Sequence, residues 1–192
     1  MEDRIRAFIA IPLPRQVKDT ARMLQRRLQE AGVRMRWVKP GAMHLTLRFL
    51  GDIDENRVPG IEKTLAETVN KTDPPALSVK GIGVFPNVKK ARVFWMGIAG
   101  RTPRLFDIRN RLENKLARLG YETERRRFSA HLTLGRARGR LDPRLLVRCI
   151  ETIGGFQAVP FTARKLVLYK SDLRPDGAVY TALAVREFVR TV

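Results

Sequence analysis

The second half of the chain repeats the first, and this repetition restricts the fold more than any other feature of the sequence. Each half begins with a strand rich in branched and aromatic residues, at residues 6–11 and 92–98. A helix with one apolar stripe follows in each half and ends at a glycine, near Gly32 and at Gly120. The repetition predicts two similar β-α-β-α-β units, so that each half supplies the same elements in the same order.

A strand that contains a histidine comes next in both halves. His44 lies 12 positions after Gly32, and His131 lies 11 positions after Gly120. These strands, residues 43–50 and 130–134, are each followed by a second amphipathic helix and another strand. The second helix of the first half is expected at residues 58–69. The second helix of the other half is expected after an N-cap at Asp142, with Pro143 in its first turn. The remaining strands are expected at residues 77–85, 161–169 and 179–185.

These elements predict an α+β fold in which two lobes are related by a pseudo-two-fold axis. We expect antiparallel or mixed sheets around a central cleft, with the helices outside. Residues 1–192 should form a single bilobal domain with pseudo-repeats at roughly 4–90 and 91–192. The single cysteine, Cys149, lies on the apolar stripe of a helix and is expected in the core, which excludes a disulfide framework.

The charge of the chain favours a polyanionic partner. Lys and Arg number 38 against 19 Asp and Glu, which gives a net charge of +19 spread along the whole sequence. A heat-resistant, arginine-rich surface is the other interpretation, but ion-pair networks need acids and these are scarce. The first apolar run ends at Pro12, too early for a membrane span, and the N-terminus lacks the pattern of a signal peptide. We therefore expect a soluble, cytoplasmic protein.

The only two histidines of the chain begin the same string, His-Leu-Thr-Leu. On a strand, the histidine and threonine share one face, roughly 6–7 Å apart, and the two leucines share the other. The leucines should anchor each strand in the core, while the histidine and threonine face away from it. The residues of the two motifs are His44, Leu45, Thr46 and Leu47, and His131, Leu132, Thr133 and Leu134.

If the lobes meet face to face, both His–Thr pairs lie in one cleft. One imidazole can act as an acid while the other acts as a base, and the threonine hydroxyls can donate to an anion between them. Arginines flank the second motif at residues 125–127 and at Arg136, Arg138 and Arg140. Since no carboxylate lies at metal-ligand spacing from either histidine, the pattern favours phosphate-ester cleavage or transfer without a metal. The spacing does not decide which histidine is the acid, and a purely structural role is the usual one for a lone histidine.

The paired motifs resemble those of the 2H phosphoesterase superfamily, and within it the RNA 2′,3′-cyclic phosphodiesterases, also called 2′-5′ RNA ligases. The similarity spans nearly the whole chain and includes the residues around both motifs. The matching context is Trp37-Val38, Arg48-Phe49-Leu50-Gly51, Phe128, Arg136, residues 168–173, Gly177 and Tyr180.

This resemblance implies an enzyme that opens 2′,3′-cyclic phosphate ends of RNA to 2′-phosphomonoesters and can join tRNA halves through a 2′-5′ linkage without a nucleotide. It implies that His44 is the proton donor and His131 the proton acceptor, while Thr46 and Thr133 hold phosphate oxygens. No metal or cofactor is expected, and the protein should act as a monomer on RNA, away from membranes. The further substrate-binding residues expected are Arg127, Phe128, Arg136, Tyr169 and Ser171.

Two other functions remain open from the sequence. The first is a phosphodiesterase that acts on small cyclic nucleotides or on 2′-5′ oligonucleotides. The second is a non-catalytic RNA-binding module whose histidines only contact phosphate. The high positive charge favours an RNA-sized substrate over a small nucleotide.

Overall fold

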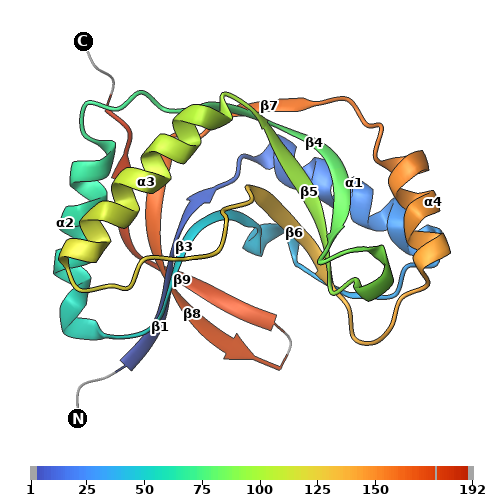
Figure 1. The fold of residues 1–192 in the computed structure, drawn as a ribbon, viewed down its shortest axis with the longest axis horizontal. Coiled ribbons are helices and arrows are strands. Elements are labelled where there is room, and N and C mark those ends of the chain that lie inside the picture. Colours follow the sequence, from blue (N-terminus) through green and yellow to red (C-terminus); the bar gives the residue numbers. More distant parts are fainter. Residues whose placement is uncertain (1–3, 176, 190–192) are drawn as a thin grey trace.

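The strands and helices follow each other in the order that the repeat predicts (Figure 1). The computed structural model describes residues 4–175 and 177–189. Its α-helices are α1 (Arg15–Glu30), α2 (Val58–Val69), α3 (Thr102–Arg118) and α4 (Pro143–Ile153). Its strands are β1 (Arg4–Pro12), β2 (Arg36–Trp37), β3 (His44–Asp54), β4 (Ala76–Phe85), β5 (Val93–Gly100), β6 (His131–Arg136), β7 (Val159–Thr162), β8 (Lys165–Arg174) and β9 (Gly177–Glu187). Short 3₁₀ helices lie at η1 (Pro40–Ala42), η2 (Glu55–Arg57) and η3 (Val88–Lys90).

The described strands form two sheets. Sheet A has the order β3-β1-β8-β9, and sheet B has the order β2-β6-β5-β4-β7. Every strand pairing that the structure describes is antiparallel. The predicted α+β class with antiparallel sheets is therefore confirmed.

The two sheets do not correspond to the two halves of the chain. The first half supplies β1 and β3 to sheet A, but its later strand β4 lies in sheet B, between β5 and β7. The second half supplies β5 and β6 to sheet B, whereas β8 and β9 complete sheet A. Each sheet thus depends on strands from both halves, and one continuous apolar core joins them.

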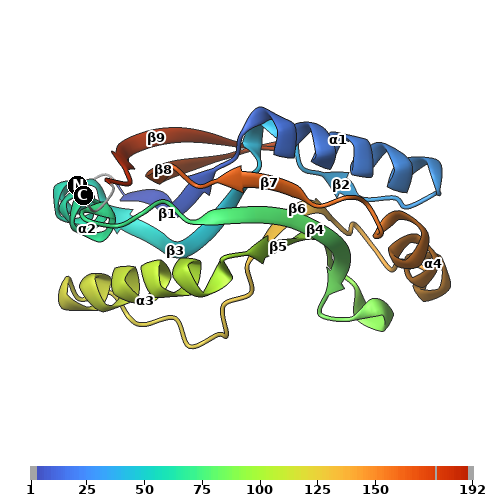
Figure 2. The same cartoon turned by 90° about the horizontal axis from the view of Figure 1, so that it is seen from above.

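The helices pack in two pairs on the outside of the sheets. Helices α2 and α3 contact each other, and they contact sheet A through β8, β9 and β3. Helices α1 and α4 also contact each other, and they contact sheet B through β7 and β4. Figures 1 and 2 show α2 and α3 at one end of the molecule and α4 at the other. None of the described helices combines the length and apolar character needed to cross a membrane.

The helix ends agree with the glycines that the sequence singled out. Gly32 and Gly120 have φ angles of 93° and 84°, a left-handed conformation that glycine adopts without steric cost. After each glycine the chain turns back, since the next amide donates to the carbonyl five residues earlier, Val33 to Leu28 and Tyr121 to Leu116. The Asp142 cap is also confirmed, because its carboxylate accepts from the amide of Arg144.

Two details of the predicted elements are wrong. Residues 161–169 were expected as one strand, but they divide between β7 in sheet B and β8 in sheet A. The chain leaves β7 where the amide of Ala163 donates to the carbonyl of Pro75, and no glycine or proline marks this change of sheet. The short strand β2 lies in a basic stretch that carried no strand signal, because it forms only by pairing with β6.

Candidate active site

The two histidine strands come from different sheets and contact each other. His44 begins β3 in sheet A, and His131 begins β6 in sheet B. The side-chain amide of Gln25 donates to the carbonyls of Val38 and Leu134, both at 2.8 Å, and ties the region before the first motif to the second. In both motifs the leucines are buried, while the histidine and threonine are only partly covered. The predicted alternation of faces is therefore present in both copies.

A bulge follows both motifs at the same position. Thr46 pairs with Ala10, yet Arg48 pairs with Ile9, so the residue between them has no partner across β1. On β6, Thr133 pairs with Trp95 and Gly135 pairs with Phe94, so the residue between Thr133 and Gly135 has no partner across β5. A one-residue bulge shifts the alternation, so the third residue after each threonine returns to the face that carries the histidine. These third residues are Phe49 on β3 and Arg136 on β6.

Aromatic rings surround His44. Phe8 stacks on its imidazole with ring centroids 4.6 Å apart, Tyr180 meets it edge-on at 5.0 Å, and Tyr169 lies at 6.1 Å. This burial desolvates the imidazolium form and lowers the pKa of His44 from 6.5 to about 4, although a hydrogen bond to the backbone carbonyl of Ala42 opposes the shift. His44 is therefore neutral at pH 7.

His131 has fewer aromatic neighbours and a nearby cation. The ring of Phe85 meets it edge-on, with centroids 5.0 Å apart. Burial again lowers the pKa of His131, the backbone carbonyl of Ser129 opposes this, and the positive charge of Arg136 lowers the pKa further. The two histidines thus share a motif but not an environment.

Both imidazoles are held by the same backbone contact. His44 Nδ1 lies 2.9 Å from the carbonyl oxygen of Ala42, and His131 Nδ1 lies 2.7 Å from that of Ser129. Each carbonyl belongs to the residue two positions earlier. A carbonyl can only accept, so Nδ1 carries a hydrogen and Nε2 remains for a substrate. A neutral ring then offers Nε2 as a base, and a protonated ring offers it as an acid.

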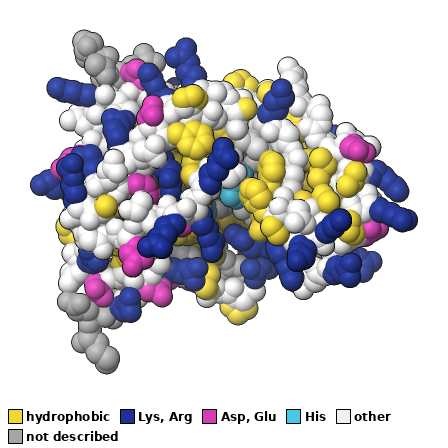
Figure 3. Space-filling model, in the orientation of Figure 1, with side chains coloured by type: hydrophobic (Ala, Val, Ile, Leu, Met, Phe, Trp, Pro, Cys, Tyr) yellow, Lys and Arg dark blue, Asp and Glu magenta, His cyan; other side chains and the backbone are white. Residues whose placement is uncertain are grey.

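Arginine side chains lie near both histidines. Arg136 lowers the pKa of His131, and it also acts on Tyr180, whose ring lies 5.0 Å from that of His44. Arg6 on β1 acts on Tyr180 as well. Figure 3 shows a histidine side chain in a hollow of this face, with Lys and Arg side chains around it. The arrangement suits an anion bound between the two imidazoles.

A buried cluster of charges links the first motif to the loop that leads to the second. Glu113 on α3 is almost fully buried, and its Oε1 lies 3.7 Å from Arg48 Nε and 3.3 Å from Arg109. Its other oxygen accepts from the amide of Glu124 at 3.4 Å, and Arg48 also donates to the carbonyl of Glu122. Arg48 directly follows the first motif, so this cluster fixes the loop before His131 relative to β3.

The other residues predicted to bind substrate fall into two groups. Tyr169 and Arg136 lie beside the histidines, and Ser171 is buried opposite Tyr180 in the pairing of β8 with β9. Phe128 instead packs on α3, with its ring 5.5 Å from that of Phe106. Arg127 is exposed on the loop before β6.

Sequence reasoning missed two aromatic residues of the cleft. Phe8 is buried beneath His44, but it lay in an apolar run in which both faces of the strand look alike. Trp95 pairs with Thr133 and its ring lies flat against Gly83, where an added Cβ would come within 2.4 Å of the indole. Its buried Nε1 has no hydrogen-bond partner among the described residues. The pattern within a single strand carries no signal for either position, because each depends on the strand that pairs beside it.

No group of three His, Cys, Asp or Glu side chains in residues 4–175 and 177–189 is arranged to hold a metal ion. The phenol rings of Tyr169 and Tyr180 lie beside the imidazole of His44. Burial raises the pKa of both phenols, so they are neutral hydrogen-bonding groups at pH 7.

Comparison with known proteins agrees with this geometry. The chain is 33% identical to the RNA 2′,3′-cyclic phosphodiesterase of Methanothermobacter thermautotrophicus over 95% of its length and 98% of that protein. It is also 33% identical to the protein of the same name from Thermotoga maritima, with 96% of each chain covered. The fold is similar to TT0787 of Thermus thermophilus, with a TM-score of 0.79, 23% identity, and 96% and 98% of the two chains covered.

A structure of Escherichia coli LigT complexed with 3′-AMP is also similar, with a TM-score of 0.78, 22% identity, and 98% of this chain and 100% of that chain covered. The family described as LigT like Phosphoesterase matches residues 11–95 and 99–180, in two segments that each contain one histidine motif. These two segments cover most of the chain. The matched histidine strands and these similarities show that the chain belongs to the LigT-like phosphoesterase family.

Proposed function

We propose that the protein hydrolyses 2′,3′-cyclic phosphate ends of RNA to 2′-phosphomonoesters by acid–base catalysis with two histidines. The observation that carries this proposal is the matched pair of imidazoles, each held at Nδ1 by a backbone carbonyl, in a cleft that Arg136 makes positive. The names of the relatives from Methanothermobacter and Thermotoga support the substrate class. The 3′-AMP complex of E. coli LigT supports a cleft of nucleotide size.

In this reaction a water oxygen attacks phosphorus opposite the 3′-oxygen, and the bond from phosphorus to the 3′-oxygen breaks. His131 Nε2 takes a proton from the water, and His44 Nε2 gives a proton to the 3′-oxygen, which becomes a hydroxyl. The products are a 2′-phosphomonoester and a free 3′-hydroxyl. Thr46 and Thr133 donate hydrogen bonds to the two phosphate oxygens that take no part in bond breaking.

The environment of His44 adds a condition to its role as donor. Its pKa of about 4 leaves it neutral at pH 7, and a neutral imidazole with a hydrogen on Nδ1 cannot donate from Nε2. A phosphate anion beside the ring favours the imidazolium and raises its pKa. Substrate binding and protonation of His44 are therefore coupled in the proposed mechanism.

The same chemistry includes ligation. If the 5′-hydroxyl of a second RNA replaces water, it forms a 2′-5′ linkage as the 3′-oxygen leaves, and no nucleotide is consumed. We include this joining of tRNA halves in the proposal, together with a monomeric enzyme in the cytoplasm. Small cyclic nucleotides and 2′-5′ oligonucleotides are the competing substrates, and the net charge of +19 favours the longer RNA.

The test is turnover of an RNA that ends in a 2′,3′-cyclic phosphate, with analysis of the product. The proposal expects a 2′-phosphate from the intact protein and loss of turnover in His44→Ala and in His131→Ala. A 3′-phosphate product would show that the other oxygen leaves. Tight RNA binding without turnover would support the non-catalytic module, and turnover of 2′,3′-cyclic AMP but not of RNA would support the small-nucleotide enzyme.

A further inference from the structure

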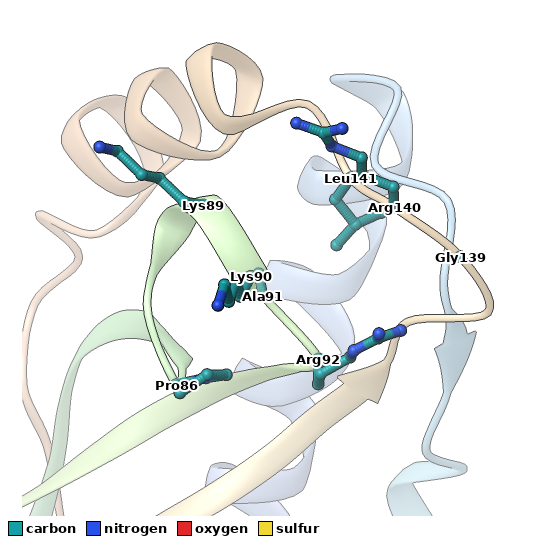
Figure 4. Close-up of a pocket in the computed structure, with 8 residues that line it drawn as sticks. All are labelled: Pro86, Lys89, Lys90, Ala91, Arg92, Gly139, Arg140 and Leu141. Carbon is teal, nitrogen blue, oxygen red and sulfur yellow. The ribbon is translucent and has the colours of Figure 1, made fainter.

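A basic pocket lies beside the cleft, at the end of sheet B. It has a volume of about 580 Å³ and lies between η3 and the loop that joins β6 to α4 (Figure 4). Four cationic side chains line it, Lys89 and Lys90 from η3, Arg92 before β5, and Arg140 from the loop. Pro86 and Leu141 add apolar surface. The pocket is large enough for a nucleotide and offers partners for its phosphate and its base.

The two segments that form this pocket are free of acidic residues. Residues 74–106 and 125–141 contain no aspartate or glutamate, and each segment contains six Lys and Arg residues. The two segments meet at the pocket, where η3 faces the β6–α4 loop (Figure 4). In the described part of the chain, the Lys and Arg residues that form ion pairs are not those that line the pocket. Examples of such pairs are Lys115 with Glu67 and Arg186 with Glu62. Such a concentration of positive charge favours a polyanion.

Backbone contacts connect the pocket to residues beside His131. Pro86 follows Phe85, whose ring contacts that of His131. Arg92 is held beside the same residue, because its amide donates to the carbonyl of Phe85 at 2.7 Å. Its own carbonyl accepts from Ala137, the residue after Arg136. Arg136 therefore lies along the chain between His131 and the residues of the β6–α4 loop that line the pocket.

A second observation supports a bound backbone in this region. Arg36 on β2 lies directly opposite Arg136 on β6. Like charges directly opposite each other in an antiparallel pair are destabilising unless an anion neutralises them. Arg36 and Arg136 extend the positive surface on the side of β6 that leads to the pocket.

We propose that this pocket binds the phosphate backbone of a single-stranded RNA whose 3′ end occupies the cleft. The proposal rests on the proposed function for the position of the RNA end, and it adds an exosite that selects a chain of several nucleotides over a lone nucleotide. Lys89, Lys90, Arg92 and Arg140 contact phosphates, and Pro86 and Leu141 contact a base or ribose.

The test compares two substrates with the same 2′,3′-cyclic end, a dinucleotide and a 20-nucleotide single-stranded RNA. The pocket variant is Lys90→Ala with Arg140→Ala. The control, Lys63→Ala with Arg118→Ala, removes the same charge from exposed positions of α2 and α3. We expect the ratio of kcat/KM for the long RNA to that for the dinucleotide to fall about tenfold in the pocket variant and to stay constant in the control. The log–log salt slope for the long RNA should become shallower by about 1.4, at about 0.7 for each lost phosphate contact.

Fluorescence anisotropy with a 20-nucleotide RNA that ends in a hydroxyl separates this proposal from the proposed function. If the protein has no turnover but only the pocket variant loses RNA affinity, the exosite stands and the catalytic proposal fails. If turnover is normal and both variants bind RNA equally, the exosite is refuted. Binding to phosphatidylserine vesicles that is lost in the pocket variant, with RNA affinity unchanged, would also refute it, because the pocket would then bind a lipid surface.

Discussion

The two histidine strands carry the same motif, the same bulge and the same backbone contact at Nδ1, yet their surroundings differ. Phe8, on the strand beside β3, stacks on His44, and Phe49, the residue after the bulge, contacts Phe8. Next to His131 the position after the bulge holds Arg136. The repeat thus supplies two imidazoles with the same backbone contact, but His44 has more aromatic neighbours and His131 has the nearer cation.

This difference bears on the roles of the two histidines. Aromatic burial disfavours the imidazolium of His44, so the ring takes up a proton from solvent when the substrate anion binds and raises its pKa. Arg136 also disfavours the imidazolium of His131, which keeps that ring ready to accept a proton. The pKa values of both rings are lowered, and a nearby anion raises the pKa of the ring beside it. A donor at His44 and an acceptor at His131 therefore require that the substrate anion lies closer to His44. The following predictions test this comparison.

The largest effect should come from removing either imidazole. His44→Ala and His131→Ala should each lower turnover by about 10²- to 10⁴-fold, the usual contribution of a positioned acid or base. A substrate with sulfur in place of the 3′-oxygen needs no protonation of its leaving group, so it should restore much of the rate in His44→Ala and little in His131→Ala. Single-turnover rates on both substrates measure this. Rescue of His131→Ala instead would exchange the two roles.

The pH dependence of the free protein should separate the two histidines. Since the chain has two histidines, proton NMR gives two imidazole signals, which His44→Gln assigns. The signal of His44 should titrate near pH 4, that of His131 should also titrate below 6.5, and inorganic phosphate should raise both midpoints. A midpoint for His44 at or above 6.5 in the free protein would remove the proposed asymmetry.

The same shift affects stability. Between pH 6.5 and 4 the unfolded chain binds a proton at residue 44 and the native protein does not, so the free energy of unfolding should fall as the pH falls through this window. The loss from His44 amounts to about 3 kcal/mol at most. Urea denaturation at pH 7 and pH 4.5 should show a smaller difference in His44→Gln than in the original protein. An unchanged difference would contradict the burial of a neutral imidazole.

Replacing the two residues after the bulges should have a smaller effect. Arg136→Ala should lower kcat/KM about 10- to 100-fold, because a charge-assisted hydrogen bond to phosphate contributes about 1.5–3 kcal/mol. Phe49 is 58% exposed, so Phe49→Ala should change kcat/KM by less than about threefold. Steady-state kinetics at constant ionic strength provide the comparison, with Arg136→Lys as the variant that keeps the charge. Equal effects of the two alanine variants would show that Arg136 does not face the phosphate.

Removal of metal ions should have no effect. The proposed acid and base are both imidazoles, so activity should survive exhaustive treatment with EDTA. Loss of activity that a divalent ion restores would mean that a histidine acts as a metal ligand, and the comparison of donor and acceptor would no longer apply.

Local patterns were sufficient to predict the helices and the faces of the histidine strands. The stripe of α1 is fully buried at Val17, Ala21, Leu24 and Leu28, as its spacing predicts. The bulge after each motif could not be predicted, because it depends on which residue of the neighbouring strand pairs with the threonine. Without it, simple alternation would place Arg136 in the core. The resemblance to a family pointed to Arg136, but the structure supplies the physical reason for its position.

The parts of the prediction that failed share one cause. β7 and β8 are separate because their partners lie in different sheets, and β2 forms because β6 is beside it. Phe8 is buried by rings that come from β8 and β9. Each of these features depends on contacts between distant parts of the chain, which the periodicity of a single segment does not encode.

The exchange of strands between the two halves has a consequence for how the molecule can move and unfold. Because β4 completes sheet B and β8 completes sheet A, neither half can bury its apolar residues without the other. We expect one cooperative unfolding transition, and we expect a chain cut near residue 91 to regain structure only when both fragments are mixed. We therefore expect the shared core, and not a hinge, to set the spacing of the imidazoles, so that the substrate adapts to a cleft whose walls do not move apart.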